Sequence, residues 1–215
     1  IGCFSLHESK ALSGGDGGLF VTNNQSYYEK ALVLAHPGRM NREITNLELK
    51  SLAEGGFGFK YRIHGLAAAL VNSQLVNLET RIQTSNRNFE YLQKMFARFS
   101  FFSSLNLDNT RRRGGWKKGI VRYNSNELNN TSRNEFVKAL IAEGVRADFE
   151  YEDSLVANLI PFEKYGLVTS PHTQSIFDSL VLFPDICSYS VDTSLLIEEY
   201  GKAIEKVEEH YRSKR

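Results

Sequence analysis

The side chains with the clearest chemical potential lie near the start of the chain. Ser5 and Lys10 follow an apolar, β-prone run, and glycines crowd residues 14–18. A lysine amine condenses with an aldehyde to form a Schiff base, while a hydroxyl group and free backbone N–H groups can hold a phosphate. Pyridoxal phosphate needs both kinds of partner. Taken alone, this spacing is more often that of a solvent-exposed loop, and no Gly-Lys-Ser/Thr follows to make it a Walker loop.

The Lys10 segment is the first of several motifs that occur in a fixed order along the chain. Residues 2–18 contain Phe-Ser-x-x-x-x-Lys followed by Gly-Asp-Gly-Gly, and residues 36–38 read His-Pro-Gly. Further blocks lie at 58–62, 67–69, 74–75, 116–123, 136–140 and 144–145. Together they resemble the DegT/DnrJ/EryC1/StrS family of pyridoxal-phosphate-dependent sugar aminotransferases. The resemblance runs through nearly all 215 residues.

The resemblance gives three residues a role. Lys10 would form the Schiff base with pyridoxal phosphate and would then move a proton between the amino acid and the cofactor. Ser5 would hydrogen-bond the cofactor phosphate. Lys60 stands where the family has an asparagine that binds the phosphate of the neighbouring subunit's cofactor, and a lysine can pair with phosphate as a point charge. A homodimer is therefore expected, and the pattern offers no metal ligands.

Other residues of the matching blocks have a structural alternative. Tyr61 and Arg62 match the family, but packing explains them equally well. His7 is expected to support or pack against its neighbours rather than to react, and we expect the same of His36 and of His64. His172 stands beside Pro171 in an expected loop. In a dehydratase branch of the family a histidine replaces the lysine, so Lys10 favours amination over dehydration.

The family's remaining cofactor contacts are not found in these residues. They are an acidic residue that pairs with the pyridine nitrogen, an aromatic residue that stacks on the ring, and a further glycine-rich turn. Without the acidic partner the ring is a poor electron sink. The chain also begins at Ile1 within an expected strand. We therefore expect a fragment that by itself binds pyridoxal phosphate weakly, if at all, and does not transaminate.

The resemblance and the alternation of strands with helices predict the fold class. We expect α/β architecture, namely the C-terminal part of a fold-type-I transferase. Residues 1–90 would be a remnant of the large cofactor-binding domain, and residues 91–215 a small C-terminal α/β domain. Residues 102–119 and 150–178 are candidate loops facing the substrate or an interface.

Local patterns predict the individual elements. Strands are expected at 2–6, 19–22, 120–123 and 180–183, and helices at 25–35, 63–82 with a continuation over 85–99, a segment that Thr131 or Ser132 caps and Gly144 ends, and 193–211. Residues 39–60 read as irregular. The last helix should turn Leu196, Tyr200, Ala203, Ile204 and Val207 inward. The glycine cluster implies a connection with positive φ.

Composition excludes several classes of protein. Hydrophobic residues make up 41% of the chain and charged residues 24%, which is ordinary for a globular protein. The net charge of +1 gives no reason to expect a nucleic-acid partner or an anionic membrane surface. Two lone cysteines, Cys3 and Cys187, do not make a disulfide framework, so a cytoplasmic setting is expected. The basic residues 111–113 and 117–118 read as a solvated loop.

Three functions stay open at this point. The first is an aminotransferase that moves an amino group from glutamate or glutamine to a keto-sugar nucleotide or cyclitol. The second is a non-catalytic homologue or fragment that acts in dimerisation or ligand sensing. The third is a pyridoxal-phosphate-dependent sugar dehydratase, which the lysine at position 10 disfavours.

Overall fold

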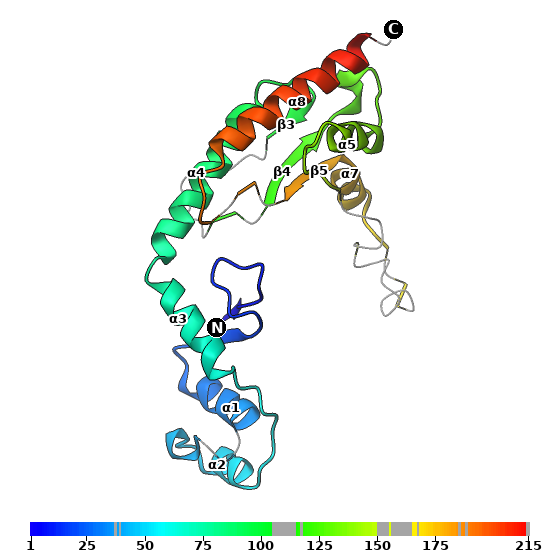
Figure 1. Cartoon of the computed structure of the whole chain (residues 1–215). Helices are drawn as coiled ribbons and strands as arrows, with labels where there is room; N and C mark the ends of the chain where they lie inside the picture. Colours follow the sequence, from blue (N-terminus) through cyan, green and yellow to red (C-terminus); the bar gives the residue numbers. More distant parts are fainter. Residues whose placement is uncertain are drawn as a thin grey trace. The chain divides into compact units, whose positions relative to one another are not determined.

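The computed structural model describes residues 1–36, 38, 40–104, 115–116, 118–149, 155, 165–166, 168–184, 186–187 and 189–213. The chain divides into two compact units, Ile1–Glu79 and Thr80–Arg215. Figure 1 shows their elements in chain order. The basic residues 111–113 and 117, and most of the two candidate loops, lie outside the described residues.

The Ile1–Glu79 unit begins with a β-hairpin. Strands β1 (Gly2–Ser5) and β2 (Gly18–Val21) pair antiparallel, with Gly2 opposite Val21 and Ser5 opposite Gly18. Their apolar side chains are largely exposed, Phe4 to 57% and Phe20 to 45%. The two expected strands are thus present, and they pair with each other.

Three helices follow the hairpin within this unit. They are α1 (Gln25–Ala35), α2 (Leu47–Glu54) and α3 (Gly65–Leu75), with the short 3₁₀ helix η1 (Asn41–Glu43) between the first two. Asn24 caps α1 and Asn46 caps α2, each accepting a hydrogen bond from a backbone N–H of the first turn. Helices α1 and α2 lie side by side (Figure 1), and Leu32, Ile44 and Ala53 form a small core.

Two expectations for this unit were wrong. Residues 39–60 are not irregular, since they contain η1 and α2. The helix expected over 63–82 is interrupted, because α3 ends at Leu75 and α4 (Leu78–Phe96) begins after a turn in which Asn77 N–H bonds to Gln74 O. The apolar rhythm continues across this turn, so periodicity could not locate it. Leu66 and Leu70, which belong to this apolar rhythm, are 77% and 51% exposed.

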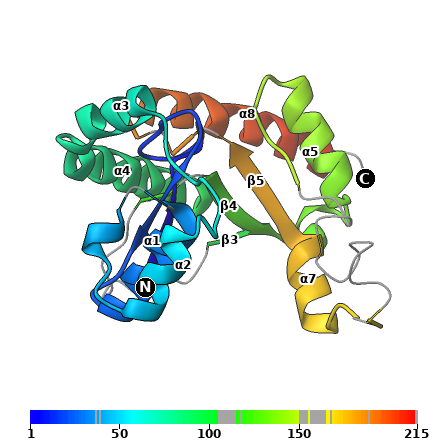
Figure 2. The ribbon, with the colours of Figure 1, turned by 90° about the horizontal axis from the view of Figure 1, so that it is seen from below.

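The Thr80–Arg215 unit contains an antiparallel three-stranded sheet. Strands β3 (Phe102–Ser103), β4 (Lys118–Tyr123) and β5 (Leu180–Pro184) lie in that order, with Val121 opposite Val181. Helix α7 (Pro171–Ser179) runs directly into β5, as Figure 2 shows. His172 therefore lies in the first turn of a helix and not in a loop, because Ser170 caps that helix.

Two further helices complete this unit. Helix α5 (Arg133–Ala142) starts at a capping box in which Ser132 and Glu135 exchange hydrogen bonds, and it ends before Gly144, whose φ is +87°. The last helix, α8 (Ser194–Ser213), buries Tyr200, Ile204 and Val207 as expected. Leu196 was misassigned, since it is 43% exposed.

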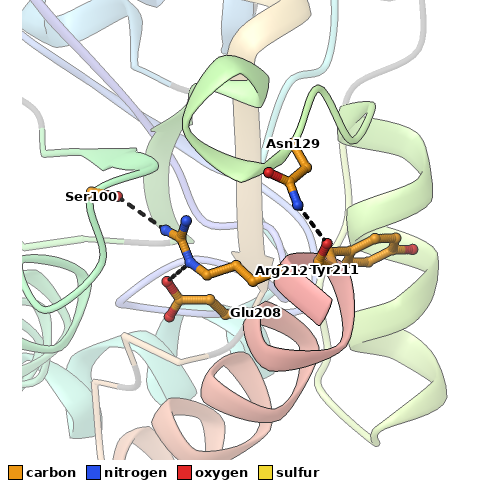
Figure 3. Close-up of polar contacts among 5 residues, drawn as sticks. All are labelled: Ser100, Asn129, Glu208, Tyr211 and Arg212. Carbon is orange, nitrogen blue, oxygen red and sulfur yellow. Dashed lines mark hydrogen bonds and ion pairs between the residues drawn. The ribbon is translucent and has the colours of Figure 1, made fainter. Parts of the chain in front are cut away.

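Polar contacts fix the C-terminal end of α8 (Figure 3). Arg212 pairs with Glu208 at 2.7 Å and donates to Ser100 Oγ at 3.4 Å. Asn129 follows the short helix η2 (Ser125–Leu128) in the left-handed region, with φ of +50°, and its amide donates to Tyr211 O at 2.8 Å. These bonds join the end of α8 to two connecting segments of its own unit.

The main core of the chain lies in this second unit. It joins α4, the three strands, α5 and α8 through buried side chains that include Phe89, Phe96, Phe136, Phe183 and Ile204. Trp116, the sole tryptophan, stacks on Phe89 with ring centroids 3.9 Å apart. None of the helices that the structure describes is both long and apolar enough to cross a membrane.

Candidate active site

The end of β1 positions the candidate lysine. Leu6, which follows the strand, is only 2% exposed, and its N–H donates to Gly17 O at 2.9 Å. Its carbonyl accepts from Gly14 N–H, also at 2.9 Å. Residues 6–14 therefore form a turn whose two ends are joined by a backbone hydrogen bond. We call residues 6–14 the lysine turn.

Lys10 lies within the lysine turn and is exposed. Its backbone N–H donates to His7 O at 3.0 Å, which fixes the main chain at this residue. Among the described residues no carboxylate forms an ion pair with its amine. The amine is thus accessible to a small aldehyde.

Ser5 is joined to the same turn through His7. Ser5 is exposed at the end of β1, and its Oγ accepts from His7 N–H at 3.3 Å. The His7 ring is engaged locally, because Nδ1 accepts from Ser9 N–H at 3.3 Å and lies 3.2 Å from Ser9 Oγ. The structure thus brings Ser5 and Lys10 to one end of the hairpin. The backbone of His7 connects them, since its N–H donates to Ser5 Oγ and its carbonyl accepts from Lys10 N–H.

The glycine cluster allows the chain to return to β2. Gly15 and Gly17 have φ of +83° and +124°, as expected for a connection that needs the left-handed region. A Cβ on Gly17 would lie 3.0 Å from Ile63 Cδ1, and one on Gly14 would lie 3.2 Å from Val71 Cγ2. Larger residues would therefore collide with the segment before α3 or with α3 itself.

A contact that sequence reasoning missed secures the far end of the turn. The Gln74 side chain accepts from Ser13 N–H at 3.1 Å and donates to Ser13 O at 2.7 Å. Gln74 stood out only as part of a block that resembles the family. Because 61 residues separate the partners, no local pattern could have paired them.

Lys60 lies in a different part of this unit. It is exposed, its carbonyl accepts from Arg62 N–H at 2.9 Å, and the preceding Phe59 N–H donates to Leu34 O at 2.6 Å. Phe59 and Tyr61 stack with centroids 5.2 Å apart. None of the contacts among the described residues joins Lys60 to Ser5 or to Lys10.

His64 has a structural task at the start of α3. His64 is the N-cap of α3, and its Nδ1 accepts from Leu66 N–H at 3.2 Å. This agrees with the default role expected for it.

The residues that are present fit part of a pyridoxal phosphate site. An accessible amine and an exposed hydroxyl lie at the same strand end, beside a glycine segment whose backbone leaves open space at Gly15. An amine can bind an aldehyde, and the hydroxyl with nearby N–H groups suits a phosphate. Lys10 and Ser5 are therefore the residues of this unit that would hold the group.

The mixed α/β fold is that of fold-type-I pyridoxal-phosphate-dependent sugar aminotransferases. The chain matches the model of the DegT/DnrJ/EryC1/StrS aminotransferase family over residues 1–193, and it belongs to that family.

Curated relatives cover parts of the chain. Protein MosB of Rhizobium meliloti is 32% identical over 111 residues, which are 47% of this chain and 22% of that protein. The putative L-glutamine:3-amino-2,3-dideoxy-scyllo-inosose aminotransferase of Streptoalloteichus tenebrarius is 26% identical over 145 residues, 67% of this chain and 34% of that protein. The chain thus spans about a third or less of the length of these relatives.

Solved structures share the fold over most of the chain. DesI, determined in the presence of its TDP-sugar product, has a TM-score of 0.69 and 20% identity, covering 99% of this chain and 52% of that one. The Escherichia coli GDP-4-keto-6-deoxy-D-mannose-3-dehydratase with bound hydrated PLP has a TM-score of 0.73 and 15% identity, covering 94% and 54%. The chain therefore corresponds to about half of each solved relative.

Proposed function

We propose that this chain supplies the lysine-bearing part of an aminotransferase that moves an amino group from glutamate or glutamine to a ketone on a sugar nucleotide or cyclitol. The observation that supports this most directly is the accessible Lys10 amine on the lysine turn, which follows the strand that ends at Ser5. Family membership supports the reaction class, and relatives named for glutamine-dependent cyclitol amination and for UDP-sugar transamination support the substrate classes.

The proposed roles follow from what each side chain offers. When bound, pyridoxal phosphate would supply an aldehyde for the amine and an electron-withdrawing ring beside the carbon that loses its proton. Lys10 would bind that aldehyde and, once released as a neutral amine, would carry the proton to and from the substrate carbon. Ser5 would donate its hydroxyl hydrogen to a phosphate oxygen.

Lys60 would act on a second copy of the chain. Among the described residues of this unit no contact joins Lys60 to Ser5 or to Lys10. This supports a role for Lys60 in the neighbouring subunit of the expected homodimer. We assign residues 1–90 to the cofactor-binding domain and residues 91–215 to the small domain as part of the same proposal. A cytoplasmic location is likewise part of it.

The test compares two lysines in the complete gene product that carries this chain. Lys10→Ala should lower the rate of amino transfer from glutamate or glutamine by roughly 10²–10⁴-fold, the usual contribution of a general acid–base group. Lys30→Ala, an exposed lysine on α1, should leave it unchanged. Borohydride with pyridoxal phosphate should modify Lys10 selectively, as peptide mass mapping would show.

The same experiment separates the alternatives. Full amino transfer by the Lys10→Ala variant would overturn the proposed role. If the unsubstituted protein neither binds pyridoxal phosphate nor aminates a ketone but still dimerises, the non-catalytic function is indicated. Loss of a sugar hydroxyl group without net amination would indicate a dehydratase. The 215-residue chain alone should be modified only weakly, so tight and selective modification of it would contradict our expectation for the isolated segment.

A further inference from the structure

The lysine turn is held at two places, and only one of them belongs to the hairpin. At the near end, Leu6 is buried and hydrogen-bonded to Gly17 and Gly14. At the far end, Ser13 belongs to neither strand and lacks a strand partner for its N–H and its C=O. Gln74 of α3 satisfies both groups.

The Gln74 amide is used almost completely in this contact. Nε2 donates to Ser13 O at 2.7 Å and to Leu70 O at 3.0 Å, while Oε1 accepts from Ser13 N–H at 3.1 Å. A primary amide has two donor hydrogens, and both have an acceptor here. A carboxylate cannot donate and an ammonium cannot accept, so a side chain of either kind cannot replace this pair of bonds.

Helix α3 presents one face to this end of the turn. Ala67, Val71 and Gln74 recur at helical spacing, and a Cβ on Gly14 would lie 3.3 Å from Ala67 O and 3.2 Å from Val71 Cγ2. Because Gly14 is closely packed there, the far end has little freedom to slide along the helix. The amide of Gln74 then fixes its register by bonding to both backbone groups of a single residue.

We propose that Gln74 is a positioning residue, which clamps the far end of the lysine turn to α3 and thereby sets where Lys10 lies. The clamp itself is independent of any reaction. Its consequence for amino transfer rests on the proposed function of Lys10.

Two isosteric changes on α3 test the clamp in the 215-residue chain. Gln74→Glu keeps the shape, removes the donors and places a negative charge beside two carbonyl oxygens. A carboxylate could still accept from Ser13 N–H, but its charge repels Ser13 O and Leu70 O, so the contact should open. Amide hydrogen exchange of Ser13 and Gly14 should then accelerate by roughly tenfold or more, because the far end of the turn is no longer held. Asn72→Asp adds the same charge at an exposed position of the same helix and should leave both amides unchanged.

Two internal readouts separate a local effect from unfolding. The Thr45 amide, bonded to Glu29 in the same unit, should exchange equally in all variants. Acidification should restore the Ser13 and Gly14 amides in Gln74→Glu, because a protonated carboxyl both donates and accepts. The unsubstituted chain over the same pH range is the reference, because His7, Glu8 and Asp16 are ionisable residues in and beside the turn. Restoration would be absent if the variant had simply unfolded.

Borohydride modification of the complete gene product links the clamp to Lys10. With pyridoxal phosphate, the ratio of modification at Lys10 to that at Lys30 should fall in Gln74→Glu and stay unchanged in Asn72→Asp. Unchanged exchange at Ser13 and Gly14 in Gln74→Glu would overturn the inference whatever the activity. A different pair of results would overturn the proposed function and leave the clamp intact. These are faster exchange at Ser13 and Gly14 in Gln74→Glu, together with no modification of Lys10 even in the unsubstituted protein.

Discussion

The Thr80–Arg215 unit and the Ile1–Glu79 unit differ in how much apolar side chain they bury. The Thr80–Arg215 unit packs aromatic and aliphatic residues from its helices and strands into one continuous core. The Ile1–Glu79 unit buries a small cluster around Leu32, Ile44 and Ala53 and leaves the apolar side chains of its hairpin and of α3 largely exposed. Apolar packing therefore stabilises one unit, while polar contacts of Glu29 and Gln74 hold the backbone of the other.

The largest expected effect comes from emptying the core of the Thr80–Arg215 unit. Phe136 is fully buried and stacks on Tyr123 with centroids 4.7 Å apart. Phe136→Ala should lower the free energy of unfolding of this unit by roughly 3–5 kcal/mol, because it removes apolar contacts and leaves a cavity. Urea titration followed by Trp116 fluorescence measures it, since the sole tryptophan lies in this unit. Ile141→Ala, at a 54% exposed position of α5, should shift the midpoint far less.

A backbone collision should affect the Ile1–Glu79 unit alone. Gly58 has φ of +145°, and a Cβ there would overlap Val33 O and lie 2.9 Å from Leu34 O. Gly58→Ala should cost roughly 1–3 kcal/mol from the overlap in addition to its backbone strain. Gly56→Ala, with φ of +76° and open space, should cost only the roughly 1–2 kcal/mol of a left-handed residue.

Amide exchange of Phe59, whose N–H bonds to Leu34 O, reports this change. Trp116 fluorescence should not move in either variant. A parallel loss of the Trp116 signal would show that the two units do not unfold independently, and the comparison drawn above would then be wrong.

A smaller effect concerns pH and Glu29. This carboxylate is 2% exposed and accepts hydrogen bonds from the Thr45 hydroxyl, from Gln25 and from the N–H groups of Thr45 and Asn46. These bonds, led by that of the Thr45 hydroxyl, lower its pKa from 4.5 to about 2. Because the folded-state pKa lies below the ordinary one, the stabilisation is present above about pH 4.5 and is lost as the pH falls towards 2.

Glu29→Gln should therefore lower the protection of the Thr45 and Asn46 amides from hydrogen exchange at neutral pH. It should also make this protection depend less on pH in acid. Glu54→Gln, on the exposed surface of α2, serves as the control. An unchanged acid profile in Glu29→Gln would show that another group titrates.

The smallest effect is a difference in thiol reactivity, since each unit holds one cysteine. Cys3 is exposed, whereas Cys187 is 1% exposed and burial raises its pKa to about 12. A thiol reagent should label Cys3 promptly and Cys187 only when its unit opens, because the thiolate is the reactive form. Phe136→Ala should accelerate labelling of Cys187 without changing that of Cys3, and Cys3→Ser identifies each signal by mass spectrometry.

The parts of the fold that sequence could predict depend on local signals. The turn residues, the glycines and the run of β-formers located β1, β2 and α1. The two candidate caps, Thr131 and Ser132, located the start of α5, and Ser132 is the one that caps it. Helix α2 was missed because it is short and is held by a distant carboxylate, that of Glu29, at its entry. The break between α3 and α4 was missed because the apolar rhythm crosses it.

The candidate site was predictable in its residue types and not in its support. Lys10 and Ser5 came from a motif contained within a few residues, so their proximity needed no tertiary information. The Gln74–Ser13 pair joins positions 61 residues apart, and a glutamine in a helical sequence gives no sign of its partner. Helix α3 shows a second limit of sequence reasoning. Its apolar residues recur at helical spacing, but this spacing does not reveal whether other residues of the same chain pack against them.

The backbone bond at Lys10 separates the position of that residue from its chemistry. The bond from Lys10 N–H to His7 O, and the closure of the turn between Leu6 and Gly14, use main-chain atoms only. Any residue except proline can make them. A substitution at position 10 would thus exchange one functional group for another at an unchanged place in space. Solved structures with this fold include aminotransferases and a dehydratase. Such a turn lets evolution, or a protein engineer, replace the side chain at position 10 in a single step while the backbone that positions it stays the same.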